Sequence, residues 1–85
     1  MSETRDARLR RLRMRSWRRG IKEMDLILEA FARRSLELMD QEELQLYDDL
    51  ICENDQDLYR WVTQQEPAPE RFAALVTQIA AQYQE

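Results

Sequence analysis

The most distinctive stretch of this sequence offers the chemistry of recognition. Arg19 supplies a fork of N–H donors, Gly20 is the only glycine in the chain, and Glu23 places a carboxylate four residues after the arginine. An arginine and a carboxylate at this spacing either pair locally or bind complementary groups on another molecule. A glycine beside them allows close approach of another backbone, or lets the chain turn as a helix C-cap or corner. The pattern therefore indicates a binding site or a plain helix corner.

Catalytic residue types are scarce. Histidine is absent from the 85 residues, which removes His-based triads, the usual zinc-ligand sets and the commonest general base. Cys52 is the single cysteine and has no basic neighbour in sequence, so we expect it to be a small packing residue in a reducing cytosol. We therefore expect no enzyme, no catalytic residue and no metal site.

Charge is divided unevenly along the chain. Residues 1–34 hold eleven Arg and Lys against five Asp and Glu, whereas residues 35–85 hold two against twelve, and the formal net charge is −4. Eight of the arginines lie between Arg5 and Arg19. This asymmetry indicates either an oriented surface for a partner or attraction between the two halves within the fold.

The elements that must position these residues are expected to be helices, because one glycine and two prolines leave few places to turn. The stretch from Arg5 to Arg19 predicts a basic surface helix that turns Leu9 and Leu12 inward. A strongly amphipathic helix follows Gly20, and cations close its last turn.

Two acidic residues are expected to start later helices. Asp40, with Glu43 three residues on, has the spacing of a capping box, and Asp55 is expected to cap a short helix. Asp48 and Asp49 are expected to face solvent. The segment containing Pro67 and Pro69 predicts a break before the last helix.

These patterns predict an all-α protein, a small compact five-helix bundle in one domain over residues 1–85, with residues 1–4 flexible. No apolar run reaches the ~20 residues that span a bilayer, and the N-terminus does not resemble a secretory signal. We therefore expect a cytoplasmic location and no membrane insertion. The expected core consists of Leu28, Phe31, Leu44, Tyr47, Leu58, Trp61, Phe72, Leu75, Val76 and Ile79.

The motif also carries a family resemblance. Arg19-Gly20-x-x-Glu23, followed by Asp25 and an apolar run to Phe31, resembles the RGxxE signature of the SdhE family. The resemblance covers roughly residues 8 to 80. It continues through Leu44-x-x-Tyr47-x-x-Leu50, Asp55-x-Asp57-Leu58-Tyr59-x-Trp61 and Pro67-Ala68.

The resemblance implies a chaperone-like assembly factor. Members of this family bind the flavoprotein subunit of succinate dehydrogenase, or of the related fumarate reductase, and promote covalent attachment of FAD to it. The FAD would belong to the partner, since this chain has no phosphate-binding glycine loop and is expected to bind no cofactor tightly. The partner-binding residues that the motif implies are Arg18, Arg19, Gly20, Glu23 and Asp25.

Two other functions remain open. The arginines of residues 5–19 could contact nucleic acid, although the sequence pI of about 4.9 and the acidic second half oppose a polyanion. A small regulatory or antitoxin-like protein-binding module is the other alternative. We expect a protein partner and no nucleic acid.

Overall fold

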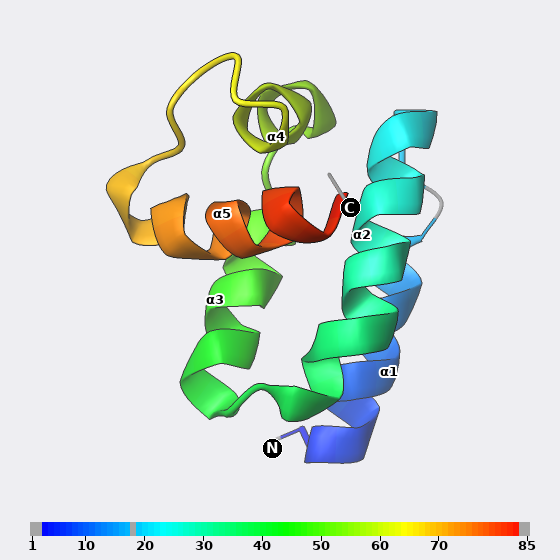
Figure 1. Ribbon diagram of the computed structural model, residues 1–85. Coiled ribbons are helices and arrows are strands. Elements are labelled where there is room, and N and C mark those ends of the chain that lie inside the picture. The colour runs from blue at the N-terminus through cyan, green and yellow to red at the C-terminus, as the bar shows by residue number, and fades with distance from the viewer. Residues whose placement is uncertain (1–2, 18, 84–85) are drawn as a thin grey trace.

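The computed structural model describes residues 3–17 and 19–83, and all its regular structure is helical. Figure 1 shows α1 and α2 side by side, α5 running above α3 toward α2, and α4 packed against α5; α3 also contacts α1. The predicted all-α class is therefore confirmed. The elements are α1 (Arg5–Ser16), α2 (Lys22–Ser35), the 3-10 helix η1 (Leu36–Leu38), α3 (Gln41–Ile51), α4 (Asp55–Val62) and α5 (Glu70–Tyr83).

One hydrophobic cluster holds these helices together, and every α-helix contributes to it. Phe31 of α2 stacks on Tyr47 of α3 with ring centroids 5.6 Å apart. Nine of the ten predicted core residues are buried, and Trp61 is partly buried at the core edge, tilted against Phe72 with ring centroids 6.4 Å apart. The apolar stripes of α2 and α5 thus identify the inward faces correctly.

The start of α3 is fixed by a capping box. The backbone N–H of Glu43 donates to Asp40 Oδ1 at 2.8 Å, and the backbone N–H of Asp40 donates to Glu43 Oε1 at 3.0 Å. Two N–H groups that the helix leaves without partners are thereby satisfied. The prediction that Asp40 starts this helix is confirmed.

The first helix is shorter than predicted. It ends at Ser16 because Trp17 is extended, with φ −104° and ψ 157°, and its N–H turns back to the Met14 carbonyl. Gly20 therefore lies in the connection between α1 and α2 and is not a helix C-cap. Its φ is not positive, so the turn itself does not require a glycine.

Two other positions differ from the sequence prediction. Asn54 caps α4, since its Oδ1 accepts the Gln56 N–H at 2.8 Å, and Asp55 is the first helical residue. Cys52 is exposed because α3 ends at Ile51, the last residue of its buried face. The predicted cap at Asp55 and the predicted packing role of Cys52 are therefore wrong.

No helix within residues 3–17 and 19–83 is long and apolar enough to cross a bilayer. The same described residues contain no group of three or more cysteine, aspartate or glutamate side chains placed to hold a metal ion.

Candidate functional site

The predicted motif begins in the connection between α1 and α2 and continues into the first turn of α2. Arg19 turns inward from the connection. Its Nε donates to Asp55 Oδ1 at 2.9 Å, and its Nη2 lies 2.7 Å from the same oxygen. Its Nη1 donates to the Arg15 carbonyl at 2.9 Å, and its Nη2 donates to the Ile51 carbonyl at 2.7 Å. With only 12% of its side chain exposed, Arg19 joins α1, α3 and α4 at one point.

Gly20 presents bare backbone at the surface. Its N–H donates to Asp55 Oδ2 at 2.7 Å, while the residue itself is exposed. A Cβ at this position would lie 3.5 Å from that oxygen, which is an ordinary van der Waals distance. The fold would therefore accept a small side chain here.

Glu23 lies in the first turn of α2 and is exposed. Among the residues that the structure describes, its side chain has no hydrogen-bond or ion-pair partner, and Arg19 pairs with Asp55 in its place. A local Arg19–Glu23 pair is therefore not formed. The helix N-terminus favours a carboxylate at this place.

Two further residues, Arg18 and Asp25, belong to the predicted site. Asp25 is half-buried in α2, and Arg18 lies outside the described residues. Of the five residues that the motif implies, the structure thus places Gly20 and Glu23 on the surface and Arg19 in contacts within the chain.

Sequence reasoning missed the role of Asp55 in this site. Its carboxylate accepts from both Arg19 and Gly20 because Asn54 has already capped α4. An asparagine directly before an aspartate at a helix start leaves one of the two side chains spare. That spare acid is the signal that could have identified Asp55.

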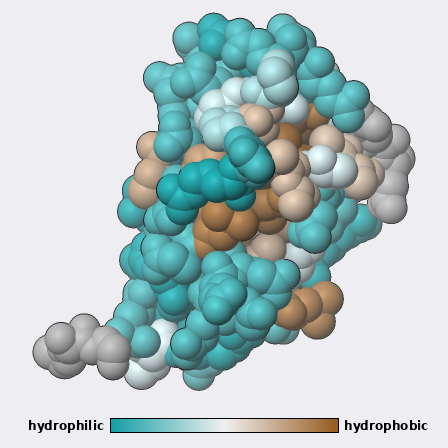
Figure 2. All heavy atoms as spheres, turned by 90° about the vertical axis from the view of Figure 1, so that its left-hand side faces the viewer, coloured by the Kyte–Doolittle hydropathy of each residue, from teal (hydrophilic) through white to brown (hydrophobic). Residues whose placement is uncertain are grey.

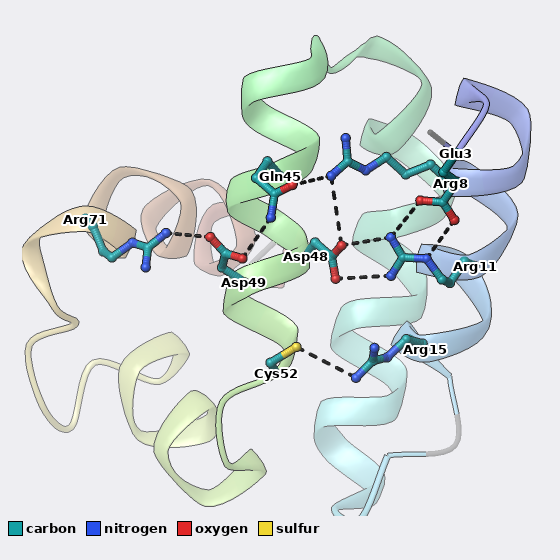
Figure 3. A network of polar contacts seen from close by, with 9 residues as sticks. All are labelled: Glu3, Arg8, Arg11, Arg15, Gln45, Asp48, Asp49, Cys52 and Arg71. Carbon is teal, nitrogen blue, oxygen red and sulfur yellow. Dashed lines mark hydrogen bonds and ion pairs between the residues drawn. The ribbon is translucent and has the colours of Figure 1, made fainter. Parts of the chain in front are cut away.

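Several arginines of α1 contact polar side chains within the fold (Figure 3). Arg11 donates to Asp48 Oδ2 at 2.8 Å and to Asp48 Oδ1 at 3.2 Å, and its Nε donates to Glu3 at 2.8 Å. Arg8 donates to Gln45 and lies 4.0 Å from Asp48. The attraction between the two halves of the chain, one of the two interpretations of the charge pattern, is therefore observed.

These ion pairs change the titration of the groups that they join. The hydrogen bond from Arg11 lowers the pKa of Asp48 below its ordinary value, although partial burial works against this shift. The hydrogen bonds that Arg11 donates to Glu3 and Asp48 raise the pKa of Arg11. Only 15% of the Asp48 side chain and 35% of the Asp49 side chain is exposed, and Arg71 pairs with Asp49 at 2.6 Å. The expectation that both aspartates face solvent is wrong.

A buried polar pair closes the end of α1. Ser16 Oγ donates to the Leu12 carbonyl at 2.7 Å and lies 2.6 Å from the Tyr47 hydroxyl. Ser16 and Tyr47 are fully buried, and burial raises the pKa of Tyr47 to about 12. Apolar periodicity identified Tyr47 as core but gave no signal for its partner.

Exposed apolar side chains border α2 on both sides. Met14 and Trp17 line a hollow with Arg33, and Leu26 and Tyr83 line a second hollow with the same arginine. All four apolar side chains are about half exposed or more. Because Leu26 follows Glu23 by three residues on α2, the motif and this apolar surface adjoin.

A different hollow lies on the face that Figure 2 shows, where hydrophobic atoms reach the surface between hydrophilic ones. Trp61, Ala68 and Val76 line a hollow under the α4–α5 connection. The described residues that the motif implies, Arg19, Gly20, Glu23 and Asp25, do not line it.

A small all-α protein that presents bare backbone and a carboxylate beside exposed apolar side chains has the features of a protein-binding module. A family model described as flavinator of succinate dehydrogenase, Sdh5, matches residues 10–83. The chain belongs to this family, which confirms the resemblance seen in the sequence.

Relatives in yeasts support the same assignment. The chain is 43% identical over 74 residues to a protein of Komagataella phaffii and 44% identical over 75 residues to one of Candida glabrata. It is also 41% identical over 75 residues to a protein of Saccharomyces cerevisiae. All three are named succinate dehydrogenase assembly factor 2, mitochondrial.

The matches cover most of this chain and a smaller part of each relative. They include 84%, 85% and 85% of this chain, in the order given above, but only 39%, 49% and 46% of the relatives. The chain thus spans less than half the length of these relatives.

Proposed function

We propose that this chain is an assembly factor that binds the flavoprotein subunit of succinate dehydrogenase, or of a related fumarate reductase, and promotes covalent attachment of FAD to it. The observation that carries the proposal is the family match over residues 10–83, together with the exposure of Gly20 and Glu23 of the motif. The names of the relatives agree with this role.

The surface beside the motif supports a protein partner. Glu23 offers an acceptor, the Gly20 backbone allows close approach, and the hollows on both sides of α2 offer apolar contact. An interface usually combines an apolar centre with polar groups that fix its register. A partner surface with a donor opposite Glu23 and apolar side chains opposite Leu26 would match this arrangement.

The contribution of this chain would be positional and not catalytic. By binding the flavoprotein subunit, it would hold the flavin and the accepting side chain of that subunit in a reactive geometry. Such positioning is able to lower a barrier by several kcal/mol without any reacting group on the helper. We propose that the FAD stays on the partner and that this chain binds none tightly.

The compartment is part of the same proposal. The relatives are named mitochondrial, and the cytoplasmic location expected from this sequence stays a prediction. The chain would have to be in the compartment where the flavoprotein subunit folds.

The test is co-expression of the chain with a succinate dehydrogenase flavoprotein subunit in cells that lack their own assembly factor. Covalent flavin in the subunit is measured by fluorescence in a denaturing gel. We expect strong covalent fluorescence with the chain and little without it. Equal fluorescence in both samples would contradict the proposal.

A further inference from the structure

Asp55 lies at the centre of the contacts that shape the motif. Both of its carboxylate oxygens are used, since Oδ1 accepts from the Arg19 guanidinium and Oδ2 accepts the Gly20 N–H at 2.7 Å. Its side chain is 15% exposed. A charge-assisted pair of this kind fixes geometry more firmly than an exposed ion pair.

The Asp55 carboxylate has no capping role in its own helix. Asn54 supplies the cap of α4, so the Asp55 carboxylate is not needed to satisfy the first turn. Its two partners, Gly20 and Arg19, precede it in the chain by 35 and 36 positions. The contact therefore links α4 to the α1–α2 connection.

The start of α2 depends on this link. Ile21 is the N-cap of α2 and offers no side-chain cap, so the helix start lacks the usual local anchor. The residue before it, Gly20, is held by Asp55, and Arg19 is held by Asp55, the Arg15 carbonyl and the Ile51 carbonyl. The direction in which the first turn of α2 presents Glu23 is thus set from outside the helix.

We infer that Asp55 is a positioning residue for partner binding, which clamps Arg19 and Gly20 and so presents Gly20 and Glu23 to the flavoprotein. Arg19 belongs to this clamp, because three of its nitrogen atoms donate within the chain. This inference rests on the proposed function for its partner. The clamp itself is a property of the free chain.

Loss of the clamp should weaken binding of the helper to the flavoprotein and leave the maximal rate of flavinylation unchanged. A loop without its clamp still visits the clamped shape, so excess helper compensates for a small competent fraction. Asp55→Asn and Asp55→Ala should therefore raise the concentration of helper that gives half-maximal flavinylation by at least about fivefold and leave the maximal rate near that of the wild type. Asp57→Asn is the matched control, since Asp57 lies on the same helix in a half-exposed pair with Arg60.

Two measurements test this with the full chain. The first is amide hydrogen exchange of the free protein, in which both Asp55 variants should exchange faster at Gly20, whose N–H donates to Asp55, while core amides such as Leu50 stay protected. The second is the rate of covalent flavin formation at increasing helper concentration. A double variant, Arg19→Gln with Asp55→Asn, should need no more helper for half-maximal flavinylation than the less active of the two single variants. Both side chains act through one contact, so their effects should not add.

Three results would overturn the inference. The first is unchanged exchange at Gly20 in both Asp55 variants. The second is faster exchange with an unchanged half-maximal concentration. In the third, Asp55→Asn speeds exchange at Leu50 as much as at Gly20, which would assign Asp55 to overall folding. If the wild-type chain gives no flavinylation, the proposed function fails, and the exchange measurement still decides whether the clamp exists.

Discussion

Gly20 occupies a position where the fold of this chain would accept a side chain. Its φ is not positive, and among the described residues a Cβ would meet one oxygen, at ordinary contact distance. The residue is exposed, and its N–H is already paired with Asp55. Any strict need for glycine here would therefore come from a molecule that binds to this surface.

Gly20→Ala tests whether the fold or a binding partner requires glycine at this position. Because the backbone geometry suits alanine, we expect an unchanged or slightly raised melting temperature, with the reduced freedom of the unfolded chain worth up to about 1 kcal/mol. Gly20→Glu adds bulk and charge and should strongly reduce covalent flavin in the partner. Thermal unfolding and gel fluorescence measure the two effects. A large loss of stability in Gly20→Ala would place the constraint inside the fold.

Burial of Tyr47 should make the free energy of unfolding fall at alkaline pH. Its pKa rises from 10.0 to about 12 in the folded protein because burial disfavours the phenolate. The unfolded chain then loses its proton first, so the stabilising contribution is complete below pH 10.0 and is lost as the pH rises toward about 12. The slope is at most about 1.4 kcal/mol per pH unit.

Tyr47→Phe should remove this dependence, at a cost of about 1 kcal/mol at neutral pH for the lost hydrogen bond to Ser16. The free energy of unfolding in urea at pH 9 and pH 11 measures it. Tyr83→Phe is the control, since that ring is exposed. Equal losses between these pH values in wild type and Tyr47→Phe would show that Tyr47 does not cause the slope.

A regular ladder of polar contacts joins α1 and α3. Arg8, Arg11 and Arg15 contact side chains that each lie 37 residues later in the chain. Figure 3 shows these contacts along two helices that run in the same direction. Spacings of three and four residues put each set on one helix face. The partners of the three arginines are Gln45, Asp48 and Cys52.

Asp48→Asn tests this ladder. Asp48 has a lowered pKa, so its stabilising contribution is present above the ordinary value of 3.8 and is lost as the pH falls through the lower folded value. We expect the variant to lose about 1–2 kcal/mol at pH 7, because a charge-assisted hydrogen bond is removed from a mostly buried site. Asp57→Asn, in a half-exposed pair, should cost well under about 1 kcal/mol.

Urea unfolding at pH 7 and at pH 3 measures both variants. The difference between Asp48→Asn and wild type should shrink at the lower pH, where the aspartate of the unfolded chain is protonated. A difference that stays constant between the two pH values would show that the loss comes from packing and not from the carboxylate charge.

The helices and the core of the whole molecule could be predicted from local sequence patterns. Apolar periodicity identified the inward faces of α2 and α5, and the Asp40 capping box fixed the start of α3. Long-range polar partners could not be predicted in this way, since Arg19 and Asp55 are 36 positions apart and each has a plausible local role. The end of α1 at Ser16 was missed because helix propensity alone does not mark an extended Trp17.

Part of the charge asymmetry is compensated by contacts between the described residues. Arg8, Arg11, Arg13 and Arg19 all contact acidic side chains of the chain. Cations that are already paired with carboxylates contribute less to binding of a long polyanion. We therefore expect a protein partner, and the absence of nucleic-acid binding stays a prediction.

We propose that Glu23, the exposed carboxylate of the motif, acts on a partner and not on the fold. Glu23→Ala tests it, with Glu66→Ala as the control, because Glu66 is also exposed but lies in the α4–α5 connection. Each variant is co-expressed with a succinate dehydrogenase flavoprotein subunit, and its melting temperature is measured alongside the covalent flavin of the subunit. We expect an unchanged melting temperature for both variants and a sharp loss of covalent flavin for Glu23→Ala alone. Full covalent flavin with Glu23→Ala would contradict it.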